Sequence, residues 1–378
     1  MNFVNQIITG DAFAILQGLP DGIVQMCVTS PPYYGLRDYG TGKWVDGNPG
    51  CDHEAAIEAW LYRNFAQSAG LNVGIRTQMS AGRAQLKACP GCGATKEDNQ
   101  IGLEETPEAY IDRLVAVFRE VWRVLRDDGT LWVNIGDSYS DSTIGRKDAH
   151  RTIDGKPVSE KLKSHPAPRD RTNRALGPKQ LLGIPWRLAF ALQADGWILR
   201  SDIIWHKPAA MPESVTDRPT SAHEHIFLLA KQERYFYDAE AIKEKASPNT
   251  HSRGRGMHPK TAAAGSGIKA NSSFESAIRE VVPYRNKRNV WMVASQPYPE
   301  SHFATFPPKL IEPCILAGSR SGDIVFDPFM GAGTTALVAL QHGRSFLGIE
   351  LNPEYVKLAE KRIATVQQHL WTTTGGAA

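Results

Sequence analysis

The 378-residue sequence has few cysteines, little net charge and no long apolar run. Five cysteines in a chain of this length are too few for a disulfide scaffold, although two of them form a Cys-x-x-Cys that suggests metal or redox use. No apolar run approaches a membrane span, and the first residues lack the basic start and apolar core of a signal peptide. We therefore expect a soluble, cytoplasmic globular protein without membrane association.

A net charge of +3 does not by itself identify a nucleic-acid partner. Strand-like and helix-like segments alternate along the chain, which predicts an α/β fold with a mostly parallel sheet. The clearest helix begins after Thr106, with Pro107 at the first helical position, and Gly129 is expected to end it before a buried strand at 130–135. Further strands are expected at 23–28, 197–205, 226–230, 323–326 and 345–349, and further helices at 185–194, 308–317, 334–342 and 353–366.

Three long interruptions, 35–103, 138–177 and 239–298, break this alternation. The second and third are polar and basic, contain proline, glycine and serine, and offer few apolar positions to bury. We interpret all three as excursions from one core.

A glycine-containing turn, DPFMGAGTT at 327–335, lies between an apolar strand and a helix. Glycines there let a ligand approach the backbone, and the free N–H groups of a helix start favour an anionic group. The next strand ends in Glu350, and an acid at a strand end binds ribose hydroxyls in such folds. Because the third glycine of a dinucleotide fingerprint and the Lys-Ser/Thr of a P-loop are missing, a nucleoside ligand without a polyphosphate fits better.

The stretch TSPPYY at 29–34 ends an apolar strand with two prolines and two tyrosines. Taken alone it indicates a structural turn. Together with DPFMGAGTT and with GIELNPEY at 348–355, it resembles the DNA amino-methyltransferases that use S-adenosylmethionine. The catalytic motif precedes the cofactor motif, which is similar to the circularly permuted beta group of N4-cytosine and N6-adenine enzymes. The segments WHKPAAMPESVTDRP, HEHIFLLAK and HFATFPPKLIEPCILAGS also resemble that group.

The resemblance implies a Rossmann-like class I methyltransferase fold, with a mostly parallel twisted sheet and helices on both faces. We expect 1–34 and 104–238 to form the catalytic half of the core and 299–378 the cofactor-binding half. Residues 35–103 would be an inserted zinc-knuckle subdomain, and 239–298 a target-recognition insertion.

Methylating an exocyclic amino group requires acceptors for its two hydrogens, so that the nitrogen lone pair can point at the methyl donor. Ser30 Oγ and the carbonyl of Pro31 are the natural acceptors, Pro32 stiffens the corner, and Tyr33 offers a face for a flipped base. Residues Tyr34, Arg37 and Asp38 either shape this pocket or only tie down the loop.

For the cofactor, the resemblance implies that the glycine turn holds the methionine part and Glu350 the ribose. Asp11 matches a segment that reaches the adenine, with a helix cap for the residues after it as the alternative. Thr334 and Thr335 could cap the following helix and touch the cofactor carboxylate, whereas Asn352 is most simply a helix cap. The expected cofactor-binding residues are Asp11, Asp327, Phe329, Gly331, Gly333, Thr334, Thr335 and Glu350.

Four residues of the first interruption, Cys51, His53, Cys89 and Cys92, suit a tetrahedral structural zinc ion. The Cys-Pro-x-Cys-Gly turn is the stronger half of this signal. A redox pair and unligated thiols are the alternatives. With four protein ligands, no open position remains for catalysis.

Duplex DNA is the expected partner, and Lys and Arg are needed to contact its phosphates. The third interruption offers Arg253, Arg255, Arg285, Lys287 and Arg288, and the second is basic through Arg146, Lys147, Arg151, Lys161, Lys163, Arg169, Arg171 and Arg174. We expect an affinity that falls steeply with salt.

Serine rather than aspartate at the start of the motif leans toward N4-cytosine, with N6-adenine as the alternative. Methylation of RNA or of a protein amide, and a DNA-binding module without catalysis, are further alternatives. A cytosine-C5 enzyme would need a Pro-Cys nucleophile, but Cys314 lies in an apolar helix pattern and is interpreted as core. A bacterial or phage-encoded enzyme acting on intracellular DNA, either solitary or beside a separate restriction endonuclease, is expected, as monomer or homodimer.

Overall fold

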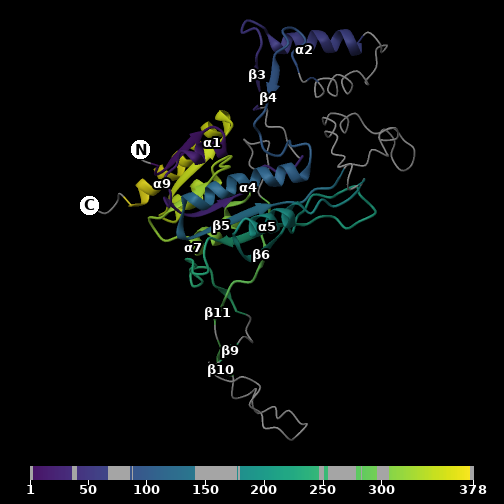
Figure 1. Cartoon of the computed structure of the whole chain (residues 1–378). Coiled ribbons are helices and arrows are strands. Elements are labelled where there is room, and N and C mark those ends of the chain that lie inside the picture. The colour runs from purple at the N-terminus through teal and green to yellow at the C-terminus, as the bar shows by residue number, and fades with distance from the viewer. Residues whose placement is uncertain are drawn as a thin grey trace.

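The computed structural model describes residues 3–35, 41–66, 86, 88–140, 177, 179–246, 251–253, 278–281, 283–295 and 306–374. Within these ranges, the side chains of 65–66, 251–253, 278–281 and 366–374 are not described. Figure 1 shows a central sheet covered by helices, from which two arms project on opposite sides. The basic stretch 146–174, together with Arg37, Asp38 and Arg255, lies outside the described residues.

An eight-stranded sheet forms the centre of the molecule, and only β7 runs antiparallel to its neighbours. This confirms the predicted mostly parallel α/β fold. From one edge to the other the strands are β1 (Gln6–Thr9), β14 (Ser345–Glu350), β13 (Ile324–Asp327), β2 (Val24–Thr29), β5 (Leu125–Ile135), β7 (His223–Ala230), β6 (Ile198–His206) and β12 (Val290–Met292).

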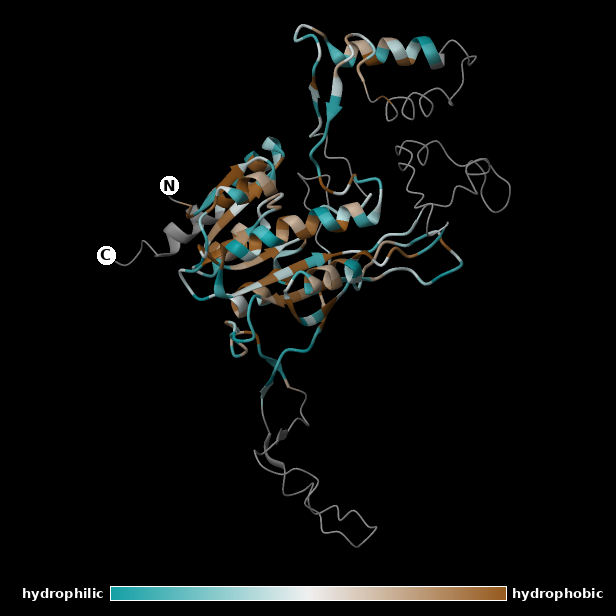
Figure 2. Ribbon diagram, in the orientation of Figure 1, coloured by the Kyte–Doolittle hydropathy of each residue, from teal (hydrophilic) through white to brown (hydrophobic). Residues whose placement is uncertain are grey.

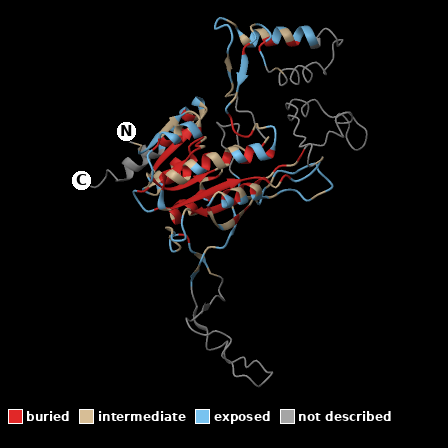
Figure 3. Cartoon of the chain, viewed as in Figure 1, coloured by how far each residue is buried: buried red, intermediate tan, exposed pale blue. Residues whose placement is uncertain are grey.

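Helices cover both faces of the sheet, as expected. Successive residues of β2 point to opposite faces, so that Cys27 belongs to one apolar cluster while Met26 and Val28 belong to the other. Figure 3 shows the sheet as the most deeply buried part of the chain. One cluster includes residues of α1 (Ala12–Gln17), α4 (Pro107–Val124) and α5 (Ile184–Ala194), and the other residues of α7 (Pro308–Gly318), α8 (Thr334–Gln341) and α9 (Pro353–Thr374).

The start of α4 follows the prediction, because the Thr106 side chain accepts a hydrogen bond from Ala109 N. Its predicted end at Gly129 is wrong. The helix ends at Val124, and Leu125 already has extended backbone and pairs with Val24 of β2. Gly129 lies inside β5, where a Cβ atom would come within 2.9 Å of the Gln25 carbonyl oxygen. This glycine therefore permits close strand packing instead of stopping a helix.

The first arm contains a ribbon of β3 (Lys43–Val45) and β4 (Thr95–Glu97), with α2 (His53–Leu61) and a π-helical turn (Tyr62–Ala66) at its tip. The second contains two antiparallel pairs, β8 (Glu244–Lys245) with β11 (Tyr284–Arg285) and β9 (His251–Arg253) with β10 (Ile278–Val281). Figure 2 shows apolar colouring concentrated in the sheet, mixed colouring on the first arm and mainly hydrophilic colouring on the described part of the second arm that carries β8 and β11. Strand β12 falls within the predicted insertion 239–298 but extends the core sheet beside β6.

The topology brings the motif residues to one edge of the sheet. Strands β1, β2, β5, β13 and β14 are parallel, so their carboxyl ends meet there. Because β7 is reversed, its first residues arrive at this same edge. None of the described helices combines the length and apolar character needed to cross a membrane.

Candidate active site

The glycine turn between β13 and α8 uses two residues in the left-handed region, Gly331 at φ 52° and Gly333 at φ 77°. A Cβ on Gly333 would meet Ala359 Cβ of α9 at 2.8 Å, so this glycine is required by packing. A Cβ on Gly331 would meet nothing nearer than the Phe329 carbonyl oxygen at 3.9 Å. The turn therefore leaves open space beside Gly331, where a ligand can approach the main chain.

Asp327 holds this turn from inside. Its carboxylate accepts hydrogen bonds from Thr29 Oγ1 and Thr335 Oγ1, both at 2.6 Å, and from Phe329 N at 3.0 Å. Burial raises the pKa of Asp327 to about 6, against the lowering effect of these three donors. Thr335 is fully buried and its hydroxyl is committed to Asp327, so a cofactor contact by this residue would have to use its main chain.

Glu350 joins the end of β14 to the glycine turn. One carboxylate oxygen accepts from Gly331 N at 2.8 Å and the other from Asn352 N at 2.8 Å. Burial raises the pKa of Glu350 against these main-chain hydrogen bonds. Main-chain groups of Gly331, Leu351 and Asn352 occupy three of the about four lone-pair sites of this carboxylate, so acceptor capacity remains for a ribose hydroxyl, which is predicted to bind there.

Of three other predicted cofactor residues, Asp11 lies at the start of α1, and Phe329 and Thr334 belong to the glycine turn itself. Asp11 caps α1 by accepting from Ala14 N at 2.9 Å, which is the alternative structural role considered from the sequence. Its adenine contact stays a prediction. Phe329 packs against the core cluster, and buried Thr334 accepts from Arg362 Nη1 at 3.2 Å.

The corner after β2 is fixed from two sides. Tyr110 on α4 donates its hydroxyl to the Pro32 carbonyl at 2.8 Å. On the other side, Gly102 packs directly against the corner, because a Cβ on this residue would lie 2.9 Å from the Tyr33 carbonyl oxygen. Tyr34 is buried, and its ring lies 5.5 Å from that of Tyr110. It therefore ties down the loop, which was one of the two roles left open for it.

The hydroxyl of Tyr33 is held by residues that the sequence reasoning did not single out. It donates to Glu224 Oε2 at 2.5 Å, and Asn134 Oδ1 lies 3.3 Å from it. Lys207 pairs with the other oxygen of Glu224. Both Lys207 and Glu224 stand in segments that resembled the family, but their apposition depends on the reversed direction of β7.

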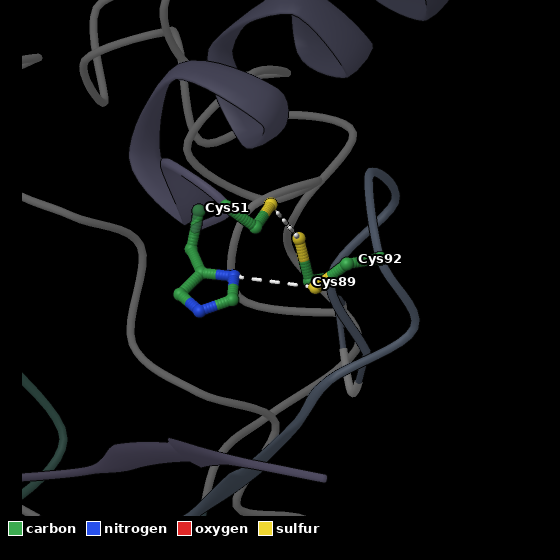
Figure 4. A group of neighbouring side chains, drawn as sticks. Cys51, Cys89 and Cys92 are labelled. Carbon is green, nitrogen blue, oxygen red and sulfur yellow. Dashed lines mark hydrogen bonds between the residues drawn. The ribbon is translucent and has the colours of Figure 1, made fainter. Parts of the chain in front are cut away.

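The four predicted metal ligands come together at the tip of the first arm (Figure 4). Their ligand atoms all lie within 4.8 Å of one another. Cys51 Sγ is 3.9 Å from Cys89 Sγ, and Cys92 Sγ is 3.5 Å from His53 Nδ1. A disulfide needs an S–S distance of ~2.0 Å, so these are separate thiols. The arrangement is compatible with zinc.

Two of the predicted DNA-binding residues are engaged within the second arm. Arg285 Nε and Arg288 Nε contact the same oxygen of Glu244, at 2.8 and 2.6 Å. The ammonium group of Lys287 lies 5.0 Å from the centre of the Trp291 ring. Arg253 falls in β9, where side chains are not described. A role in DNA binding stays a prediction for all of them.

Cys314 lies fully buried on α7 and donates its thiol to the Leu310 carbonyl at 3.9 Å. Burial raises the pKa of this thiol. A buried, protonated thiol is inert as a nucleophile, which agrees with its predicted place in the core.

The chain is similar to known DNA methyltransferases along nearly its whole length. The family described as DNA methylase (N6_N4_Mtase) matches residues 24–361. Type II methyltransferase M.Cfr9I of Citrobacter freundii is 41% identical over 354 residues, which cover 94% of this chain and 86% of the relative. Type II methyltransferase M.SmaI of Serratia marcescens is 40% identical over 358 residues, covering 95% and 90%. The solved PvuII DNA methyltransferase (cytosine-N4-specific) aligns over 97% of this chain and 92% of its own, with a TM-score of 0.51 and 16% identity, and shares the fold.

Proposed function

Because the chain belongs to the DNA methylase family and is an S-adenosylmethionine-dependent DNA methyltransferase, we propose that it methylates N4 of a cytosine flipped out of a specific duplex site. The observation that carries this choice of base is Ser30, since serine at the start of this motif leans toward N4-cytosine in the family that the sequence resembles. Adenine N6 would use the same chemistry and is the alternative that the experiment must exclude.

The exocyclic amino group is a poor nucleophile because its lone pair is delocalised into the ring. Ser30 Oγ and the Pro31 carbonyl would accept its two hydrogens and favour a pyramidal nitrogen. S-adenosylmethionine, when bound, supplies a methyl group on a positively charged sulfur. The fixed corner would hold the amino nitrogen in line with that group, which removes much of the entropic cost of bringing the reactants together. The methyl group would pass to the amino nitrogen by direct displacement as its bond to sulfur breaks, with a neutral thioether as leaving group, and the nitrogen would then release one proton to solvent. No covalent bond would form between protein and base.

The residues around the glycine turn fit this cofactor. The space beside Gly331 admits a ligand to the main chain, and Glu350 stands at the strand end with acceptor capacity left for a ribose hydroxyl. Asp11 would reach the adenine, and the main chain of Gly331 and Gly333 together with Thr334 and Thr335 would hold the methionine part.

We also propose that Cys51, His53, Cys89 and Cys92 bind a structural zinc ion. With Zn–S bonds of ~2.3 Å and Zn–N bonds of ~2.0–2.1 Å, tetrahedral geometry places two thiolates ~3.8 Å apart and a thiolate and an imidazole ~3.5 Å apart. The distances of 3.9 and 3.5 Å agree with both values. Gly47 packs against the cluster, because a Cβ there would lie 2.4 Å from Ala94 Cβ and 3.0 Å from Cys92 Sγ.

Metal analysis of protein purified without added zinc tests this site. One zinc per chain is expected, and Cys89→Ser should lose it. Cys314→Ser is the matched control, since that thiol lies in the core away from the cluster. Protein that contains no stoichiometric metal, while Cys89→Ser folds normally, would contradict a zinc site.

Double-stranded DNA would be bound by the second arm and by the basic stretch 146–174. The named relatives are type II methyltransferases from bacteria, which supports action on intracellular DNA beside a separate cognate restriction endonuclease. Native mass spectrometry distinguishes the monomer from the homodimer.

Nucleoside analysis of DNA from a host without its own amino-methylation tests the choice of base. We expect N4-methylcytosine, and its loss when Ser30→Ala replaces the native protein. Finding only N6-methyladenine would reverse the choice of base. Finding neither modification in DNA from cells that contain folded protein would refute the proposal.

A further inference from the structure

An acceptor role for Ser30 requires that its own hydroxyl proton point away from the base. A serine hydroxyl has one proton and two lone pairs, and it rotates to suit its neighbours. If that proton pointed at the substrate, it would meet the amino hydrogens and repel them. The surroundings of Ser30 must therefore provide another acceptor for it.

The contacts at the corner provide that acceptor. Ser30 Oγ lies 3.4 Å from the Tyr33 hydroxyl, and Tyr33 in turn lies 2.5 Å from Glu224 Oε2. An ionised glutamate has acceptors only, so the single phenolic proton is directed to Glu224. The Tyr33 oxygen is then left to accept from Ser30. Burial, together with the charge and hydrogen bond of Glu224, raises the pKa of Tyr33 well above its usual value, so Tyr33 stays a neutral donor.

Glu224 is itself held in place. Lys207 pairs with one of its oxygens, and the Lys207 ammonium lies 4.4 Å from the centre of the Trp205 ring. Asn134 Nδ2 donates to the other oxygen of Glu224 at 3.1 Å and also lies 3.1 Å from the His225 carbonyl. These two acceptors define which end of the Asn134 amide is the nitrogen.

The Tyr33 ring packs closely against Gly136. A Cβ on Gly136 would come within 2.8 Å of Tyr33 Cε2, so the glycine after β5 makes room for the ring. The phenol is thus positioned by the strand end on one side and by Glu224 on the other.

We propose that Glu224, fixed by Lys207 and Asn134, is a positioning residue that orients the hydroxyl protons of Tyr33 and Ser30 in one direction. Glu224 accepts from Tyr33, Tyr33 accepts from Ser30, and the lone pairs of Ser30 are left for the amino group of the base. This inference rests on the proposed acceptor role of Ser30. It adds that the partly buried carboxylate of Glu224, two hydrogen bonds away, sets the polarity on which that role depends.

Single-turnover methylation by Glu224→Gln tests the inference. The glutamine amide can donate to the Tyr33 oxygen and reverse the chain. We expect the methyl-transfer rate to fall about 10- to 100-fold, as for other residues that orient a reacting group, while the dissociation constants of cofactor and DNA change less than about threefold. Asp202→Asn is the matched control, because Asp202 pairs with His225 on the neighbouring strand, outside this chain of hydrogen bonds. Its rate should remain native.

Double-mutant cycles give the second readout. In a Tyr33→Phe background the chain is already cut, so Glu224→Gln should cost little more, and the same should hold in a Ser30→Ala background. A native rate for Glu224→Gln, or losses that add independently with those of Tyr33→Phe, would overturn the inference. If Glu224→Gln does not fold, a native rate for Tyr33→Phe alone would overturn it. A native rate for Ser30→Ala would instead refute the proposed function.

Discussion

The two left-handed glycines of the cofactor turn should respond differently to the same substitution. An alanine at either position is strained by ~1–2 kcal/mol because its φ is positive. At Gly333 the new methyl also meets Ala359 Cβ at 2.8 Å and Ala359 Cα at 3.1 Å, and such overpacking adds ~1–3 kcal/mol. Gly333→Ala should therefore lose ~2–5 kcal/mol of stability. Gly331→Ala should lose only the backbone part, because its methyl enters the space predicted for the cofactor.

Urea unfolding with and without S-adenosylmethionine separates the two effects. A ligand present at 100 times its dissociation constant adds ~2.7 kcal/mol to the free energy of unfolding. The native protein should show this increment and Gly331→Ala should lose most of it, whereas Gly333→Ala should be less stable even without ligand. The reasoning is refuted if Gly331→Ala keeps the full increment, or if both variants lose the same stability without ligand.

Three further predictions concern charged groups. Burial raises the pKa of Asp327 to about 6, so the contribution of this group to the free energy of unfolding is fully present below the unfolded pKa of ~3.9 and is lost, by ~3 kcal/mol, as pH rises through 6. Asp327→Asn should remove this pH dependence in urea unfolding. An unaltered pH dependence in the variant would contradict the prediction. The raised pKa of Glu350 predicts that cofactor affinity weakens on acidification from a higher pH than an ordinary glutamate would give; titration calorimetry should show this dependence vanish in Glu350→Gln, and its persistence would exclude Glu350 as the cause. Glu244→Gln should free Arg285 and Arg288 and tighten DNA binding. Arg288→Gln should weaken DNA binding and lower the slope of log affinity against log salt concentration by ~1. Equal affinities of both variants in a salt titration would count against the second arm as a DNA contact.

Residues that act locally were predictable from the sequence. Thr106 and Pro107 define a helix start through contacts with the next turn, and α4 begins there. The resemblance to the DNA amino-methyltransferases assigned Ser30, Asp327 and Glu350 to one site, and the parallel strands β2, β13 and β14 bring the strand ends that carry them to one edge of the sheet. The glycine turn was recognisable because few other sequences permit such a conformation.

Features that depend on strand direction and distant pairing were not predictable. The pattern of β7 indicates a strand but not that it runs antiparallel, and this reversal is what brings Glu224 to Tyr33 across 191 positions of sequence. Gly129 was predicted to end a helix, but it lies inside β5 and permits the close approach of the Gln25 carbonyl of the neighbouring strand. The pairing of Arg285 with Glu244 likewise comes from the folded ribbon of the second arm.

The single-turnover rate of Ser30→Ala, measured with cofactor and duplex DNA both saturating, tests the central claim most directly. If the serine hydroxyl accepts an amino hydrogen in the transition state, the rate of N4-methylcytosine formation should fall by ~10²–10³ although both substrates still bind. N4-methylcytosine formed at the native rate would contradict the account.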